Sequence, residues 1–279
     1  MTFDSSSATP LPTDLSAGAA DPFGTRAVLF DLDGTLVDPA GAITSGISHA
    51  LGVHGIEVPD QERLDSFVGP PLAASLASLP GVTDALIPSI VEEYRQQYLA
   101  EGMQASRVYP GIEELLSTLN AAGVTCAVAT SKPTGLAERL LSIMGIRDHF
   151  AAVHGSPEDE SIPHAGKGPI VGAALTAIGL SSSTTHDPAS SREARVVMVG
   201  DRIFDVEGAA DHGLQCIGVT WGYAPEGELQ QAGAGPIVDT ADQLRRALVE
   251  AGIMPPSDPP DSGAEQAEPV AAPARQVLD

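Results

Sequence analysis

The distribution of apolar residues along the chain shows six short runs that are rich in β-branched side chains. Gly, Asp or Thr residues bound most of these runs, which is typical of strands in a parallel sheet that is covered on both faces. The predicted strands lie within RAVLF (26–30), TCAVAT (125–130), HFAAVHG (149–155), ARVVMVG (194–200), QCIGVT (215–220) and GPIVD (235–239).

Between these runs, apolar residues recur every three to four positions, which indicates amphipathic helices. Most of these stretches end with Gly, the residue that helix C-termini prefer. The predicted helices lie within 111–123, 134–145, 167–179, 204–213 and 241–252. Alternating strands and helices predict a doubly wound, Rossmann-like α/β fold with a parallel sheet.

Residues 40–107 interrupt the alternation. Helical patterns occur there within 43–55, 61–69, 71–79 and 84–102, and no clear strand pattern is present. The sequence therefore predicts an all-helical cap domain inserted after the first strand, with the α/β core formed by 23–39 and 108–250.

The two ends of the chain, 1–22 and 251–279, are rich in Pro, Ser, Ala, Gly and acidic residues. Such segments bury too little apolar area to offset an ordering cost of about 1–2 kcal/mol per residue. We expect disordered, solvated tails, with partner-binding motifs as the alternative. The segment 181–195 is expected to be a long flexible loop.

Composition narrows the choice of partners. A formal net charge of −23 disfavours binding to a nucleic acid polymer or a membrane surface, because both require Lys and Arg to neutralise phosphates. No apolar run approaches the length of about 20 residues that crosses a bilayer, and no signal-peptide pattern is present. Cys126 and Cys216 lie in strand-like runs, where small buried thiols are expected. A cytoplasmic protein fits these features; the sequence does not indicate its oligomeric state.

The chain has only two lysines, Lys132 in ATSKP and Lys167 in AGKGP, among 14 Lys and Arg residues. A lysine that serves only solubility could be replaced with arginine, so a reason specific to ammonium is expected. A compact ammonium on a flexible stem reaches a phosphate oxygen in a crowded pocket, where a planar guanidinium fits less well. We expect Lys167 to bind phosphate; Lys132 is either a helper at the same site or a surface residue.

Polar and charged residues follow several of the predicted strands. Because ligands of parallel α/β sheets bind outside the carboxyl ends of the strands, these residues are expected to meet at one edge of the sheet. They are Asp31, Asp33, Thr130, Ser131, Lys132, Lys167, Asp201 and Asp205.

The acidic members of this set predict a metal site. Asp31 and Asp33 are two positions apart at a strand end, so extended geometry would place both side chains on the same side. With Asp201 beside them, the mutual repulsion of the carboxylates requires a divalent cation, and oxygen ligands without His or Cys favour Mg²⁺. We therefore expect Asp31, Asp33 and Asp201 to bind Mg²⁺, and Asp205 to orient a metal-bound water.

The same residues suggest a reaction. Asp31 is ionised at pH 7 and can attack phosphorus without a base, forming a phosphoaspartyl intermediate. Asp33 would protonate the leaving oxygen and later accept a proton from water. Thr130, Ser131, backbone N–H groups and Lys167 would hold the phosphoryl oxygens.

These motifs also resemble a known family. FDLDGTLVD (30–38), ATSK (129–132), a lysine at a helix start and MVGDRIFD (198–205) together resemble the four motifs of the haloacid dehalogenase (HAD) superfamily, and the helical insert resembles its C1 cap. The resemblance covers roughly residues 26–250. FVGPPL, YPGIEELL, ATSKP and GVTWGYAPEGEL look most like the phosphoglycolate phosphatase and 5′-nucleotidase-like branch.

The resemblance implies specific roles for these residues. They are Asp31 as nucleophile, Asp33 as acid/base, Thr130 and Lys167 as phosphate ligands, and Asp201 with Asp205 at the Mg²⁺ site. The expected activity is hydrolysis of a small phosphorylated metabolite, most like that of phosphoglycolate phosphatase. A 5′-nucleotidase and a phosphomutase are the alternatives, and phosphoryl chemistry on tyrosine is a remoter one. A dehalogenase needs no proton donor at Asp33, and the retention of every catalytic group disfavours a non-enzymatic interaction protein.

Specificity is expected to come from the cap, which can close over the pocket and exclude water. The loop FVGPPL (67–72), in particular Val68, Gly69, Pro70 and Pro71, is either a substrate-contact loop or a proline-braced turn between helices.

Overall fold

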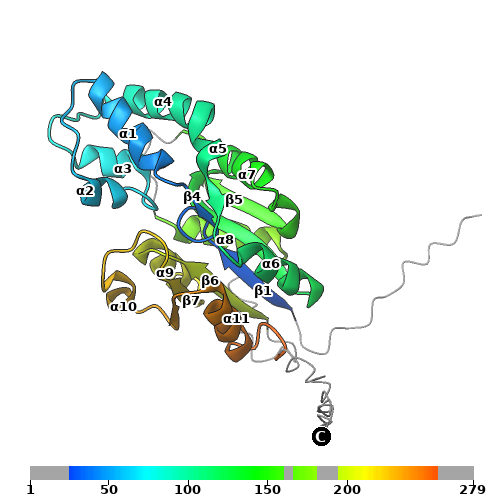
Figure 1. The fold of residues 1–279 in the computed structure, drawn as a ribbon. Coiled ribbons are helices and arrows are strands. Elements are labelled where there is room, and N and C mark those ends of the chain that lie inside the picture. The colour runs from blue at the N-terminus through cyan, green and yellow to red at the C-terminus, as the bar shows by residue number, and fades with distance from the viewer. Residues whose placement is uncertain (1–24, 160–165, 181–193, 257–279) are drawn as a thin grey trace, which may run out of the picture.

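A six-stranded parallel sheet forms the centre of the protein (Figure 1). The computed structural model describes residues 25–159, 166–180 and 194–256. The strand order is β5-β4-β1-β6-β7-β8, and every neighbouring pair is parallel. The strands are β1 (Arg26–Phe30), β4 (Thr125–Pro133), β5 (Ala152–Ser156), β6 (Arg195–Gly200), β7 (Gln215–Val219) and β8 (Ile237–Val238). The six predicted strands and the α/β fold class are confirmed.

Both faces of the sheet are covered by helices (Figure 1), which explains the continuous apolar runs. Alternate residues of β1 point to opposite faces: Val28 and Phe30 belong to one apolar cluster, and Ala27 and Leu29 to the other. The first cluster includes side chains of α6 (Ile112–Ala121), α7 (Thr134–Ile143) and α11 (Ala241–Glu250). The second includes side chains of α8 (Gly168–Ala177), α9 (Ile203–Ala210) and α10 (Glu228–Ala232).

The predicted helices of the core are present, and one helix was not predicted. The short helix α10 occurs in a segment that shows no helical periodicity. Lys167 caps the N-terminus of α8, and Pro169 lies in the first turn of that helix, where its missing N–H has no intrahelical partner to lose.

A helical insert follows the first strand, as predicted. It contains α1 (Ala42–Val53), α2 (Gln61–Asp65), α3 (Leu72–Ala77), α4 (Ile87–Gln97), a π-helix (Tyr98–Gly102) and α5 (Met103–Ala105). Figure 1 shows α1 to α4 grouped together beyond one end of the sheet. We use the term helical insert for residues 42–105; the domain bounds inferred from the sequence stay a prediction.

Two short strands that the sequence did not indicate join the segments on either side of the helical insert. They are β2 (Val37–Asp38) and β3 (Arg107–Val108), and they pair antiparallel. The pairing explains why the chain can leave the core after β1 and return beside the point of departure.

The predicted C-terminal tail is partly wrong. Its first residues continue from α11 into the core: Ile253 is fully buried and Met254 is nearly so. The backbone N–H of Ile253 donates to Leu248 at 2.9 Å, and the Arg26 guanidinium donates to the Ile253 carbonyl at 3.4 Å. The Pro- and Ser-rich composition of 251–279 concealed this apolar pair. The N-terminal tail, most of the predicted loop 181–195 and residues 257–279 lie outside the described residues.

Cys126 and Cys216 are free and buried, as expected for structural thiols. Among the residues that the structure describes, no helix combines the length and the apolar character that a membrane crossing requires.

We expect Ile253→Ala to lower the free energy of unfolding by about 2–4 kcal/mol, because it opens a cavity in a packed core. Val53→Ala is the matched control, since Val53 is 57% exposed. Denaturant unfolding of both variants measures the difference. Equal stability of the two variants would contradict the inclusion of Ile253 in the core.

Candidate active site

The order of the strands brings the predicted site residues to one edge of the sheet. β1 lies between β4 and β6, and after β5 the chain returns across β1 to begin β6 on its other side. Ligands bind at such a switch point in open α/β sheets. Asp31 and Asp201 directly follow β1 and β6, and Thr130 lies in the second half of β4. The Asp31 N–H donates to the Val199 carbonyl of β6 at 2.9 Å.

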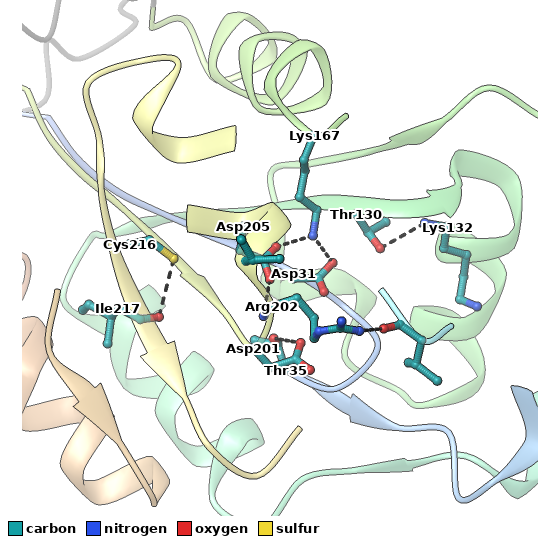
Figure 2. A network of polar contacts seen from close by, with 12 residues as sticks. Asp31, Thr35, Thr130, Lys132, Lys167, Asp201, Arg202, Asp205, Cys216 and Ile217 are labelled. Carbon is teal, nitrogen blue, oxygen red and sulfur yellow. Dashed lines mark hydrogen bonds and ion pairs between the residues drawn. The ribbon is translucent and has the colours of Figure 1, made fainter. Parts of the chain in front are cut away.

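The ammonium of Lys167 lies between the carboxylates of Asp31 and Asp205 (Figure 2). Its Nζ atom is 2.7 Å from Asp31 Oδ1, and the Lys167 side chain is only 1% exposed. Burial by itself lowers the pKa of Lys167, but Asp205 and Asp31 outweigh burial and raise it above the usual range. Lys167 therefore stays charged and compensates two buried carboxylates.

Asp201 is held by two donors from different segments. Thr35 Oγ1 donates to Asp201 Oδ1 at 3.1 Å, and the backbone N–H of Tyr223 donates to Oδ2 at 2.8 Å. Gly34 is required beside it, because its φ is +87° and a Cβ atom there would lie 2.3 Å from Asp201 Oδ2. The turn after β1 therefore packs directly on the carboxylate that follows β6.

Asp31, Asp201 and Asp205 form a buried carboxylate cluster, with ligand atoms that all lie within 4.8 Å of one another. Burial, followed by the charge of Asp31, raises the pKa of Asp201 to about 8, and burial raises the pKa of Asp205 to about 6. Lys167 compensates only part of this charge. Oxygen donors that are short of positive charge fit a hard divalent cation such as Mg²⁺.

The buried carboxylate cluster differs in its third member from the predicted metal set Asp31, Asp33 and Asp201, and the metal ligands themselves stay a prediction. β1 ends at Phe30, so Asp33 lies outside that strand, in an isolated bridge with Val37. The Asp33 side chain pairs with Lys132, whose Nζ is 3.0 Å from Oδ2. Asp205, expected to be farther from the metal, occupies the third place instead.

Lys132 pairs with only one of the two oxygens of Asp33. Asp33 is buried, and burial raises its pKa despite the opposing effect of Lys132. Its other oxygen, Oδ1, is buried without a hydrogen-bond partner in the described part of the chain. Asp33 also lines the same pocket as Asp31.

Lys132 is a buried site residue, and the alternative of a surface lysine is wrong. Lys132 is 8% exposed. Its backbone N–H donates a hydrogen bond to Thr130 Oγ1, two residues earlier, at 3.2 Å. Of the two lysines in the chain, one therefore pairs with Asp31 and Asp205, and the other with Asp33.

A pocket opens beside Asp31 and Asp33. Its polar side comes from the core and also includes Thr130, Ser131 and Lys132. Its other side comes from the helical insert and is formed by Ile43, Phe67, Val68, Gly69, Pro70, Leu72 and Tyr94. The 67–72 loop is thus both a turn between α2 and α3 and a wall of the pocket, although Pro71 is not among the lining residues.

Arg202 was not singled out from the sequence, yet it joins the 67–72 loop to the core (Figure 2). Its guanidinium donates to the Val68 carbonyl and forms an ion pair with Glu228 at 2.8 Å. The position of Arg202 directly after Asp201 was a usable signal, whereas nothing near Glu228 in the sequence indicated a partner.

Comparisons with known proteins agree with this geometry. A family model described as haloacid dehalogenase-like hydrolase matches residues 28–219. A 5′-nucleotidase of Pseudomonas aeruginosa is 37% identical over 203 residues, which are 73% of this chain and 86% of that protein. A phosphoglycolate phosphatase of Agrobacterium fabrum is 32% identical over 230 residues, 80% of this chain and 91% of that protein.

A solved structure of Protein Tyrosine Kinase A (PtkA) from Mycobacterium tuberculosis has a TM-score of 0.65 and 36% sequence identity, and the match covers 81% of this chain and 98% of that one. The chain belongs to the haloacid dehalogenase-like hydrolases, and it is a phosphatase of this family.

The raised carboxyl pKa values predict how stability depends on pH in the metal-free protein. Asp201 and Asp205 keep their protons to higher pH in the folded protein than in the unfolded chain. Between pH 3.8, the usual carboxyl pKa, and about pH 8, the folded state therefore binds more protons than the unfolded chain. The free energy of unfolding falls as pH rises through this window.

Denaturant unfolding in a chelator at pH 5 and pH 8 measures this effect. Between pH 5 and pH 8, we expect Asp201→Asn to lose less unfolding free energy than the wild type, by on the order of 2 kcal/mol. The exposed control Asp84→Asn should lose as much as the wild type. The same pH dependence in both variants would show that the carboxylate cluster is not the cause.

Proposed function

We propose that the protein is a Mg²⁺-dependent phosphomonoester hydrolase of small metabolites, which acts through a phosphoaspartyl intermediate on Asp31. The observation that carries this proposal is the pairing of two lysines with two different carboxylates at one pocket: Lys167 with Asp31, and Lys132 with Asp33. The first carboxylate is paired with a buried ammonium and the second has a raised pKa, as a nucleophile and a proton donor require.

The carboxylates of Asp31, Asp201 and Asp205 are the groups that would hold Mg²⁺. When bound, Mg²⁺ would neutralise negative charge on the phosphoryl group and on the carboxylates around it. Thr35 and the Tyr223 N–H would keep Asp201 oriented toward that position.

In the first step, a carboxylate oxygen of Asp31 attacks phosphorus and the bond from phosphorus to the ester oxygen breaks. Asp33 donates its proton to the leaving oxygen, so that an alcohol leaves. Thr130, Ser131 and Lys167 would hold the phosphoryl oxygens, which is supported by the position of the first two in the pocket lining and by the contact of Lys167 with the nucleophile.

In the second step, water attacks the phosphorus of the phosphoaspartate and the bond between phosphorus and Asp31 breaks. Asp33, now a carboxylate, takes a proton from that water, which regenerates both carboxyl groups and releases inorganic phosphate. The unpaired Oδ1 atom of Asp33 is the oxygen available for both transfers.

Phosphoglycolate is the substrate that the sequence resemblance first suggests. The pocket wall favours the 5′-nucleotidase alternative. A glycolate leaving group carries a carboxylate, but the insert residues that line the pocket carry no positive charge. Phe67 and Tyr94 instead contribute aromatic side chains to that wall. A nucleoside or a similar ring-bearing alcohol therefore fits the pocket better, in agreement with the activity named for the P. aeruginosa relative.

A cytoplasmic location, in which both buried cysteines stay reduced, belongs to the same proposal. The expected partner is the small phosphorylated substrate itself.

A panel of phosphomonoesters, assayed for release of inorganic phosphate, tests the function. We expect turnover with Mg²⁺, loss of turnover in a chelator, and higher kcat/KM for nucleoside monophosphates than for phosphoglycolate. Release of phosphate from no member of the panel would reject the hydrolase. Isomerised sugar phosphate as the main product would indicate a mutase, and phosphate transfer to tyrosine would indicate a kinase.

The variant Asp31→Asn should abolish turnover while it preserves the fold, because an amide cannot attack phosphorus. Asp84→Asn, on the exposed surface, is the matched control. Near-normal activity of Asp31→Asn, compared with the wild type, would reject Asp31 as the nucleophile.

Lys167→Ala should cost more activity than Lys132→Ala. We expect a loss of about 100-fold or more in kcat/KM for Lys167→Ala, as for the removal of a donor to a developing oxyanion. Equal losses in the two variants would contradict the assignment of Lys167 as the main phosphate ligand.

A further inference from the structure

Lys132 has a second contact besides Asp33, and this contact comes from the helical insert. Its Nζ atom lies 4.4 Å from the centre of the Tyr98 ring and 3.0 Å from Asp33 Oδ2. The Lys132 side chain is 6% exposed and Tyr98 is 1% exposed, so water does not screen either contact. The ammonium therefore lies between a carboxylate of the core and an aromatic face of the insert.

The local structure of the insert is adapted to place this ring. Tyr98 begins the π-helix that follows α4, and π-helical turns occur frequently at functional sites. Gly102 leaves the space that the ring occupies, because a Cβ atom at that position would lie 2.7 Å from Tyr98 Cδ2. The Tyr98 ring also stacks on Tyr94, which lines the pocket, with the ring centres 5.7 Å apart.

We propose that Tyr98 is a positioning residue for Lys132 and, through Lys132, for Asp33, so that the helical insert takes part in arranging the proton-transfer step. This inference rests on the proposed function. The contact path runs from Tyr94 in the pocket wall through Tyr98 and Lys132 to Asp33.

The physical basis is the number of partners that a buried ammonium needs. Lysine has a flexible stem and one localised charge, so a single carboxylate does not determine its rotamer. An aromatic face on the opposite side supplies a second attraction, which is strongest where water is excluded. Together the two contacts confine the ammonium to the side of Asp33 where Oδ2 accepts, and Oδ1 has no hydrogen-bond partner among the described residues.

This arrangement also accounts for a lysine rather than an arginine at position 132. A guanidinium is a planar fork with several donors, and a carboxylate would draw it into a two-point contact that engages both oxygens. An ammonium contacts one oxygen of Asp33 and presents its remaining charge to the ring of Tyr98.

Four variants test the proposal: Tyr98→Phe, Tyr98→Leu, Lys132→Met and the double variant Tyr98→Leu/Lys132→Met. Tyr98→Phe keeps the aromatic face and should keep kcat close to that of the wild type. Tyr98→Leu should lower kcat about tenfold, the effect expected of a lost buried cation–π contact, with little change in KM. In the Lys132→Met background, Tyr98→Leu should have no further effect on kcat.

Phe150→Leu is the matched control for the loss of a buried ring. Phe150 is 4% exposed and packs edge-on against Phe30, outside the pocket. Thermal unfolding of all the variants measures the loss of packing, which Tyr98→Leu and Phe150→Leu should share, whereas only Tyr98→Leu should lower kcat. Equal kcat losses in these two variants, or additive losses in the double variant, would overturn the proposal.

A second measurement does not depend on activity. Because the chain has only two lysines, NMR of protein labelled at the lysine ε-methylene groups gives two signals, and Lys132→Met assigns them. The Lys132 protons should be shifted upfield by the ring in the wild type and in Tyr98→Phe, and should lose this shift in Tyr98→Leu. Absence of the shift in the wild type would show that the ammonium does not lie on the ring.

The two proposals fail in different ways. A wild-type protein that hydrolyses no phosphomonoester, but shows the upfield Lys132 signal, would reject the proposed function alone. An active wild type in which Tyr98→Leu and Tyr98→Phe have the same kcat would reject only the role of Tyr98.

Discussion

The burial of one ammonium between two carboxylates is the constraint on which the rest of this site depends. Without Lys167, the carboxylates of Asp31 and Asp205 would be adjacent and unpaired in a region almost closed to water, which is strongly unfavourable. Lys167 is in turn tied to the fold, because it caps α8 and packs against Gly208 of α9. Stability and chemistry therefore share the same interaction at the centre of the sheet edge.

The parallel sheet brings together acidic residues that are far apart along the chain. β1 is the central strand at the switch point, and its neighbours β4 and β6 end at the same edge. The residues that follow them are close in space because of strand order, whatever their separation in sequence. The close packing of Gly34 on Asp201 then fixes the carboxylates relative to one another. Because these carboxylates repel one another, cations must compensate their charge.

The helical insert completes the pocket and contributes in two chemically different ways. Through Ile43, Phe67, Leu72 and Tyr94 it supplies an uncharged wall of the pocket. Through the carbonyl of Val68, bound by Arg202, and through the ring of Tyr98, in contact with Lys132, it touches charged residues next to Asp201 and Asp33. Movement of the insert would therefore change both the shape of the pocket and the surroundings of its charges.

The sequence by itself determined the six strands of the main sheet, the core helices other than α10, the inserted helices and the gathering of Asp31, Thr130, Lys167 and Asp201. Apolar periodicity is a local property of the chain, and the strand-end rule needs only the order of the elements. Only the tertiary structure decided the direction of side chains beyond the strand ends. It turned Asp33 toward Lys132, placed Asp205 in the carboxylate cluster, buried Ile253, and set Tyr98 and Glu228 beside their cationic partners. These outcomes depend on turns and on packing between segments far apart in the chain, for which no periodic pattern exists.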